Sequence, residues 1–370
     1  MITLPKLRSS AERPAAEIQP AADYGFFGPE SVTWKVWSYP TSIILGFGRA
    51  VTIEHLDPNL TAAAVAGGGV KSRPHTRFSR TVRYFAMAAF GASEPTVKAA
   101  DVLVKVHSKA IGIDPVTGGH YDANKPSSQL WIHMTAWHSI LHCYEKFGPG
   151  RLTDAEDLQF WAECARAAEL QTIDPVTVPR SREEVRAYFD AWRPHLCSSE
   201  AARDMVDFLL AVDIALPPDL ARWQRLAYLP FTKLLSKGIV ASYPHYAREL
   251  LGIKQSRSVD AAVTPLLKSL HALVAKSPEL ELWLLKLLAP AAVDVFAPVV
   301  LGIPALDPST TTPREAQRRY GFDVPNEAHL DLRAKQFDRV FNKGLSPSDE
   351  GLIESQAHIG NMQPTPRASA

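Results

Sequence analysis

The stretch RPHTRFSRTVRYFAMAAFG, residues 73–91, is the part of this sequence that most clearly indicates the fold. Pro74 suits the first position of a helix and Gly91 the position just after its end, so a helix is predicted between them. At helical spacing, one face of that helix carries Arg77, Arg80, Thr81 and Tyr84. A second and apolar face, which predicts packing against a core, carries Val82, Phe85, Ala86 and Ala89.

Two further helices are predicted after this stretch, and both carry histidines. The first spans residues 96–112 and contains His107 on an apolar background. A turn-rich loop at residues 114–121 follows it. The second is predicted at residues 129–147, with Ser127 or Ser128 as its cap. It carries Trp131, His133, Trp137, His138 and His142. Residues 73–138 are therefore the first place to look for a site.

The rest of the chain also has a helical pattern, and no segment shows the sustained alternation of a strand. Helices are predicted at residues 58–66, 154–170, 182–192, 199–210, 218–235, 244–251, 260–275, 278–288, 313–320 and 328–342. Gly46 and Gly48 interrupt the apolar segment 42–55, where they would permit close approach of another element. The fold class is all-α. We expect one large helical domain at residues 23–306 and a helical extension at residues 307–345. Loosely packed or disordered tails are expected at residues 1–22 and 346–370.

Composition excludes several classes of protein. The chain has 370 residues, of which 46% are hydrophobic, so it can bury a sizeable core. Lys and Arg total 40 against 39 Asp and Glu, and this balance argues against a nucleic-acid partner. Cys143, Cys164 and Cys197 form no C-x-x-C pair, which predicts a reducing compartment without a disulfide framework.

Two segments bear on localisation. Residues 1–23 contain no apolar run of signal-peptide length, so a cytoplasmic protein is expected. The longest apolar stretch, residues 280–306, is interrupted by Lys286, Asp294 and three prolines, which makes a spanning helix a poor fit. Two core helices are predicted there, and peripheral membrane contact is the alternative.

His107 has two interpretations. A single histidine on an apolar helix is more often a satisfied core residue than a ligand. Its functional interpretation is as the axial ligand of a heme iron, because a neutral imidazole on a helix is the usual proximal ligand in helical heme proteins. Helix arginines such as Arg77 and Arg80 usually face water, but arginine also pairs well with carboxylates such as heme propionates.

The other histidines give weaker signals. His138 and His142 stand four residues apart and could reach one metal ion, but no Glu-x-x-His or H-E-x-x-H pattern accompanies them. A structural pair beside Cys143 is the more common outcome. His133 faces elsewhere on the same helix and is the better candidate for a pocket shared with His107.

Residues 24 to about 255 resemble the MpaB/rubber-oxygenase family, through the order and spacing of several short motifs. These are Ser31-x-x-Trp34, Gly48-Arg49, Arg77-x-x-Arg80-Thr81-x-x-Tyr84, Val106-His107-x-x-x-x-Gly112, Tyr121-x-Ala123, Leu130-Trp131-Ile132-His133, Tyr144-Glu145, Phe147-Gly148, and Pro244 with Arg248-Glu249-Leu250-Leu251-Gly252.

The resemblance implies an all-helical fold with a globin-like core, and b-type heme with dioxygen as co-substrate. The characterised latex clearing proteins of this family cleave polyisoprene. By this resemblance His107 would be the heme-iron ligand, Arg77 and Thr81 the catalytic residues near the distal pocket, and Arg80 a further cofactor-binding residue. His133 belongs to the broader family pattern and would also contribute to cofactor binding.

Two departures from the family pattern limit what is transferred. The family has a lysine between its Arg and Thr that can cap the iron, whereas Arg80 stands there and is a poor ligand. Latex clearing proteins are secreted, and this chain has no export signal, so rubber is not its expected substrate. The family's proposed catalytic carboxylate matches no residue that the sequence identifies.

The expected function is that of a cytoplasmic or membrane-peripheral heme oxygenase or oxidase. It would act on an apolar small molecule or lipid and take electrons from an unidentified donor. One alternative is a non-heme metal oxidase using His107, His133 and His138. The other is a non-catalytic heme- or lipid-binding helical protein. The sequence specifies neither the substrate nor the oligomeric state.

Overall fold

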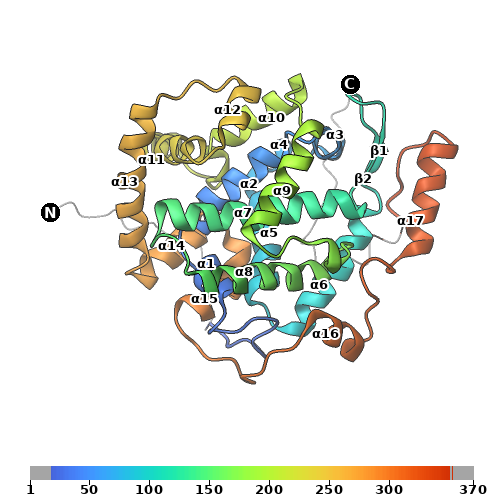
Figure 1. The fold of residues 1–370 in the computed structure, drawn as a ribbon, viewed down its shortest axis with the longest axis horizontal. Coiled ribbons are helices and arrows are strands. Elements are labelled where there is room, and N and C mark those ends of the chain that lie inside the picture. The colour runs from blue at the N-terminus through green and yellow to red at the C-terminus, as the bar shows by residue number, and fades with distance from the viewer. Residues whose placement is uncertain (1–17, 351, 353–370) are drawn as a thin grey trace.

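The computed structural model describes residues 18–350 and residue 352, and this part of the chain is all-α, as predicted. It contains 17 α-helices and a single two-stranded sheet. Figure 1 shows the longest helix, α7 (Pro126–Phe147), crossing the middle of the molecule with other helices above and below it. This helix buries 13 of its 22 residues, as expected for a helix that packs against neighbours on most sides.

The other elements surround α7. The α-helices are α1 (Val32–Trp37), α2 (Phe47–Glu54), α3 (Pro58–Gly67), α4 (Gly69–Ser72), α5 (Pro74–Phe90), α6 (Ser93–His107), α8 (Asp154–Ala167), α9 (Arg182–Trp192), α10 (Glu200–Leu210), α11 (Arg222–Ala241), α12 (His245–Leu251), α13 (Arg257–Val274), α14 (Pro278–Leu288), α15 (Val293–Val300), α16 (Pro313–Tyr320) and α17 (Leu330–Phe337). The strands are β1 (Ile111–Ile113) and β2 (His120–Asp122). The π-helical segments are η1 (Ser42–Gly46) and η7 (Asp338–Asn342), and the 3₁₀ turns are η2 (Ala168–Leu170), η3 (Pro175–Thr177), η4 (Arg193–His195), η5 (Asp213–Ala215) and η6 (Pro290–Ala292).

Local signals in the sequence fix several helix starts. The Ser31 hydroxyl accepts a hydrogen bond from the Trp34 backbone N–H, 3.1 Å away, at the start of α1. Thr153 and Glu156 form the predicted capping box of α8. Pro74 is the first residue of α5, and its fixed φ angle suits the first turn of a helix.

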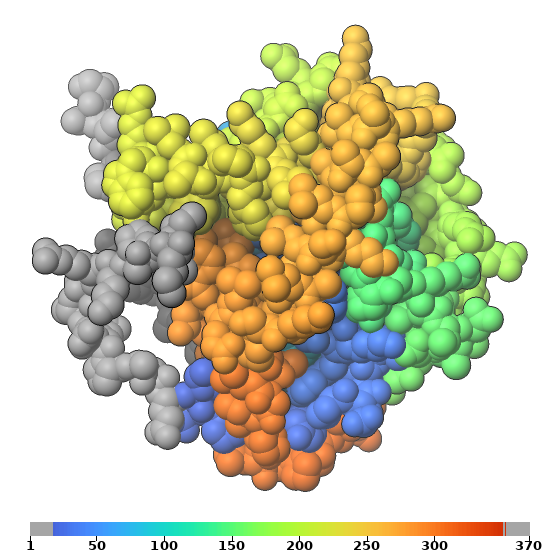
Figure 2. Space-filling model, turned by 90° about the vertical axis from the view of Figure 1, so that its left-hand side faces the viewer, coloured from blue at the N-terminus to red at the C-terminus, as the bar shows by residue number. Residues whose placement is uncertain are grey.

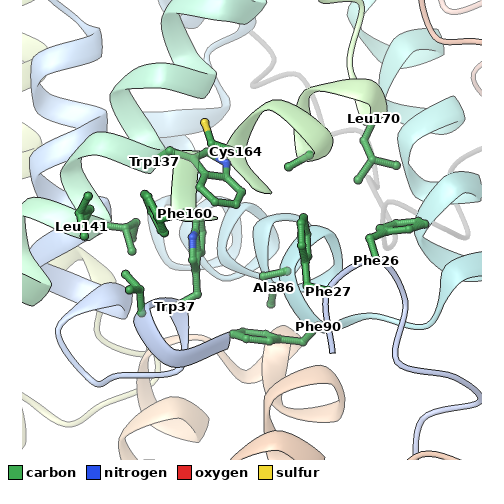
Figure 3. Packing of buried hydrophobic residues seen from close by; sticks show 14 of the residues in the cluster. Phe26, Phe27, Trp37, Ala86, Phe90, Trp137, Leu141, Phe160, Cys164 and Leu170 are labelled. Atoms are coloured by element: carbon green, nitrogen blue, oxygen red, sulfur yellow. The ribbon is translucent and has the colours of Figure 1, made fainter. Parts of the chain in front are cut away.

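Aromatic side chains from three helices make the centre of the core, as Figure 3 shows. Trp137 of α7 lies between Trp37 of α1 and Phe160 of α8, with ring centroids 5.1 Å apart in both pairs. Edge-on contacts at such distances are favourable beyond the apolar area that they bury. On α5, Val82 and Ala86 are fully buried, so the apolar face predicted from spacing is confirmed.

Gly46 allows α7 to approach the segment that precedes α2. A β-carbon at Gly46 would lie 2.6 Å from the Ile140 Cδ1 atom and 3.2 Å from its Cα atom. Any side chain there would therefore force the two elements apart. The predicted role of the two glycines in close approach is confirmed for Gly46. A β-carbon at Gly48 would lie 2.4 Å from the Ile239 Cδ1 atom, which is the end of a side chain that could rotate away.

The helix predicted at residues 96–112 ends earlier than expected. α6 ends at His107, and β1 and β2 then form an antiparallel hairpin with Gly112 opposite Tyr121. A β-carbon on Gly112 would lie 2.6 Å from the Tyr121 hydroxyl oxygen, so this glycine lets the two strands pair rather than ending a helix. The start of α7 also differs. Lys125 precedes Pro126 there, and neither predicted serine caps the helix.

Both ends of the described chain pack more closely than the sequence indicated. Residues 18–22 were expected to be loosely packed, yet the Ala21 and Ala22 carbonyls accept hydrogen bonds from the Leu306 and Asp307 N–H groups. The extension at residues 307–345 contributes Ala316 of α16 to the main core, so it is not a separate unit. Of the predicted tails at residues 1–22 and 346–370, residues 1–17, 351 and 353–370 lie outside the described residues.

The apolar segment 280–306 forms core helices, as predicted. Leu285 of α14 and Phe296 of α15 are both buried in the main core cluster. Among the described residues, no helix has the length and apolar character needed to cross a membrane.

Candidate active site

His107 is the last residue of α6, and α7 holds its ring. The Gln129 Nε2 amide lies 3.0 Å from His107 Nδ1 and also donates to the Ala123 carbonyl oxygen. Gln129 itself is 4% exposed, so it anchors the imidazole from a buried position. Burial, and after it the positive charge of Arg77, lowers the pKa of His107 to about 4. The ring is therefore neutral at pH 7, which is the form that binds a metal.

Arg77, on α5, lies close enough to His107 to affect its charge. Burial, followed by the charge of Arg80, lowers the pKa of Arg77. The same side chain is nevertheless accessible to water. Arg77 is therefore partly surrounded by protein while part of its side chain remains exposed.

The first turns of α5 carry positive charge without matching carboxylates. Among the described residues, no ion pair involves Arg73, Arg77 or Arg80, whereas Arg83 pairs with Asp294 at 2.6 Å. Burial, and then the charge of Arg73, lowers the pKa of Arg80. A cluster of this kind suits an anionic group, because unpaired cations in partly buried positions gain most from a carboxylate.

Tyr84 and Thr81 complete this face of α5. The Tyr84 hydroxyl is buried and has no hydrogen-bond partner within the described part of the chain, and burial raises its pKa. An orphaned buried hydroxyl on the same face as Arg77 indicates a polar group that is not protein. The Thr81 hydroxyl donates to the Arg77 carbonyl oxygen at 2.9 Å, so it can only accept hydrogen bonds from other groups.

The ring nitrogens of His133, which is predicted to share the pocket of His107, contact other protein groups. Its Nε2 atom donates to the Cys164 carbonyl oxygen at 2.8 Å, and its Nδ1 atom accepts from the Gln171 side-chain amide at 2.8 Å. The two ring nitrogens therefore tie α7 to α8 and to the end of η2. Burial lowers the pKa of His133 to about 4, so the ring is neutral. Both nitrogens are occupied by protein groups, so neither is available to a cofactor in this arrangement.

His138 belongs to a third environment. The Arg49 Nη1 atom lies 3.3 Å from His138 Nδ1 and donates to the Ser139 hydroxyl at 2.6 Å. The rings of His138 and His142 have centroids 6.0 Å apart. Within residues 18–350 and 352, no three His, Cys, Asp or Glu side chains come together in a group that could hold a metal ion. The alternative non-heme centre of His107, His133 and His138 therefore has no geometric support.

Sequence reasoning missed two buried charged residues of α2. Arg49 is 4% exposed and is held by neutral acceptors rather than by a carboxylate. Glu54 is 8% exposed, has no ion pair among the described residues, and burial raises its pKa to about 8. It stands beside the start of α7, where Trp131 Nε1 donates to its carbonyl oxygen at 3.2 Å. Nothing in the spacing of α2 distinguishes these residues from ordinary surface charges.

Comparison with known proteins gave one finding. A family described as the ER-bound oxygenase mpaB/B'/rubber oxygenase catalytic domain matches residues 34–276. The matched range runs from α1 to just beyond α13 and includes every residue of the predicted site. Neither the comparison with curated proteins nor that with solved structures found a match.

Proposed function

Because the chain belongs to the mpaB/rubber-oxygenase family of oxygenase catalytic domains, we propose that it is a heme b-dependent oxygenase that uses dioxygen on an apolar small molecule or lipid. Membership of this family makes the chain an enzyme of the oxidoreductase class. The heme, the substrate and the site residues are the parts that we add. The observation that carries them is the neutral His107 beside the unpaired cations of α5.

The residues present fit a heme. His107 would hold the iron through Nε2, because Gln129 occupies the other ring nitrogen. Arg77 and Arg80 would pair with the two propionates, which supply the carboxylates that this region lacks. The orphaned Tyr84 hydroxyl would find its partner on the bound group or on a water held by it.

The chemistry divides between the cofactor and the chain. Bound heme would supply the redox chemistry with dioxygen and an electron donor, which the protein itself cannot perform. Arg77 would stabilise negative charge that develops at the reacting centre, because its fixed positive charge lies in a desolvated position. Thr81 would accept a hydrogen bond from a donor at that centre, because its own hydroxyl proton is held by the Arg77 carbonyl oxygen. The apolar core around α5 and α7 would keep bulk water away.

An absorbance spectrum with a pyridine hemochrome assay tests this proposal. We expect protein made with ample heme supply to contain one b-type heme per chain, and the His107→Ala variant to lose it. Added imidazole should restore part of the Soret band by replacing the missing ligand. His245→Ala is the matched control, because the His245 side chain is 80% exposed and serves no pocket. Full heme occupancy with an unchanged Soret band in His107→Ala would refute the assignment.

Oxygen consumption distinguishes a catalytic heme protein from one that only binds heme. A heme oxygenase should consume dioxygen when a reductant and a lipid extract are supplied. Stoichiometric heme without oxygen uptake under any of these conditions would favour the non-catalytic heme-binding alternative.

A further inference from the structure

α11 has a charge pattern unlike that of the chain as a whole. Its 20 residues include Arg222, Arg225, Lys233 and Lys237 and no acidic residue. The full chain is balanced, with 40 basic and 39 acidic residues. Among the described residues, no ion pair involves Arg222, Lys233 or Lys237, and all three are exposed. The outer side of α11 is therefore locally positive.

The same side of the molecule exposes large apolar side chains. The chain has eight tryptophans, and the exposed ones are Trp223 of α11, at 64%, and Trp283 of α14, at 43%. Leu226 follows Trp223 by one helical turn and is 56% exposed. Figure 2 faces this side, where α11 (yellow), α13 (light orange) and α14 (orange) lie next to one another.

An apolar pocket lies between α11 and α14. It has a volume of about 210 Å³ and is lined by Ile44, Val212, Leu216, Tyr228, Phe231, Thr232, Leu235, Trp283, Leu284, Leu287 and Leu288. Thr232 uses its hydroxyl to donate to the Leu229 carbonyl oxygen, so its donor is not available inside the pocket. An apolar cavity of about 150 Å³ already accepts benzene, so this one can take a somewhat larger apolar molecule.

The pocket wall departs from regular backbone geometry at two points. Ile44 belongs to the π-helical segment η1, and Val212 has a φ of +56°. Both are uncommon, and a positive φ is costly for a β-branched residue. Such features persist where the surrounding structure requires them and often accompany binding sites.

We propose that this surface, which we call the α11–α14 face, docks on an anionic phospholipid bilayer. Trp223, Leu226 and Trp283 would enter the interfacial region, where tryptophan is favoured. Arg222, Lys233 and Lys237 would contact the negatively charged headgroups. A bilayer fits better than a protein partner because it matches a basic rim, interfacial aromatic residues and an adjacent apolar pocket at once.

Docking would bring the apolar pocket to the membrane. An apolar molecule dissolved in the bilayer could then enter it past Trp283 without crossing water. The use of that molecule as a substrate rests on the proposed function, whereas the docking itself does not.

Vesicle co-sedimentation of the full chain tests the docking. We expect binding to phosphatidylcholine vesicles that contain about 30% phosphatidylserine and little binding to pure phosphatidylcholine. The double variant Trp223→Ser/Leu226→Ser should bind at least about tenfold more weakly, because it loses most of the inserted apolar area. Lys233→Gln/Lys237→Gln should also reduce binding by about tenfold or more, since each lysine near an anionic surface contributes about 1 kcal/mol.

A matched control uses apolar residues elsewhere on the surface. Leu158 is 60% exposed on α8 and Val176 is 85% exposed on η3, so Leu158→Ser/Val176→Ser removes comparable apolar area from other elements. This variant should bind vesicles as the wild type does. Circular dichroism of each variant checks that the fold is retained.

Three results would overturn the proposal. The first is that the wild type binds neither kind of vesicle, which would indicate a protein partner for the α11–α14 face. The second is unchanged binding in Trp223→Ser/Leu226→Ser. The third is equal loss in the control variant. The heme content of the same preparations is read separately, so a failure of the proposed function cannot be mistaken for a failure of docking.

Discussion

Replacing Gln129 with leucine should show whether this residue supports heme binding, the stability of the fold, or both. Gln129 is 4% exposed and bridges His107 Nδ1 and the Ala123 carbonyl oxygen with one amide nitrogen. Leucine is similar in size, so Gln129→Leu removes both hydrogen bonds without opening a large cavity. If His107 held iron through Nε2, its ring proton would sit on Nδ1, and the Gln129 side-chain oxygen would accept it after the amide rotates, in exchange for the bond to the Ala123 carbonyl oxygen.

Two magnitudes follow from this geometry. Removing a residue that orients a metal-binding histidine typically costs ten- to a hundredfold in affinity, which is about 1.4 to 2.7 kcal/mol of binding free energy. The Ala123 carbonyl oxygen also loses its partner, so the free energy of unfolding of the heme-free protein should fall by about 1 to 3 kcal/mol. The assays are heme titration followed by absorbance, and urea unfolding of heme-free protein.

Gln336→Leu serves as the control for this prediction, and Gln129→Glu tests whether a carboxylate can replace the amide. Gln336 is also buried, at 1% exposed, and donates to the Ser348 carbonyl oxygen at 2.9 Å, so Gln336→Leu should cost stability without changing heme affinity. Gln129→Glu should retain the heme and lower its reduction potential, because a carboxylate makes the His107 ring more electron-rich. An unchanged heme affinity in Gln129→Leu, with the expected loss of stability, would show that Gln129 supports the fold only.

Three further predictions follow from other contacts. Gly46→Ala should lower the free energy of unfolding by about 1 to 3 kcal/mol, because the added methyl group clashes with Ile140. Ile140→Val should recover part of that loss when both changes are combined in a double-mutant cycle, measured by urea unfolding. Burial lowers the pKa of His133 from 6.5 to about 4, so the unfolded chain binds the extra proton as the pH falls from 6.5 to 4, and His133 should contribute up to about 3 kcal/mol to the loss of stability. His133→Gln should make the stability–pH curve less steep in that window, where the other buried histidines still titrate. An unchanged slope would contradict the burial argument. Arg77→Gln should raise the pKa of His107, because it removes a nearby positive charge. An NMR titration of the heme-free protein measures this pKa. An unchanged value would show that the two residues are not close.

The sequence predicted the helices well where a strong local signal marks their ends. Pro74 and Phe90 bound α5 as expected, and the Thr153 capping box opens α8. It failed after His107, where an apolar pattern that looks helical is interrupted by a strand pair. That pairing depends on Gly112 meeting Tyr121 across the hairpin, which is a contact between residues that no local window contains.

The predicted site residues divide in the same way. Arg77, Arg80 and Thr81 share a face because helical spacing alone requires it. The charge of Arg77 contributes to lowering the pKa of His107, although the two residues belong to different helices. His133, on α7, is predicted to share their pocket, yet the Cys164 carbonyl of α8 and the Gln171 side chain beyond η2 engage its two ring nitrogens. The partners of a buried imidazole come from neighbouring elements, so spacing within one helix cannot identify them.

By itself, the amino-acid sequence determined the all-α class, the family and the polar face of α5, because these depend on periodicity, turn residues and motif order along one chain. Only the tertiary structure decided which groups are buried together. It placed Gln129 on His107, left the Tyr84 hydroxyl without a partner among residues 18–350 and 352, and turned Trp223 and Trp283 outwards on one side. The reason is physical: desolvation and hydrogen bonding depend on what surrounds a side chain in three dimensions, and elements distant in the sequence supply those surroundings.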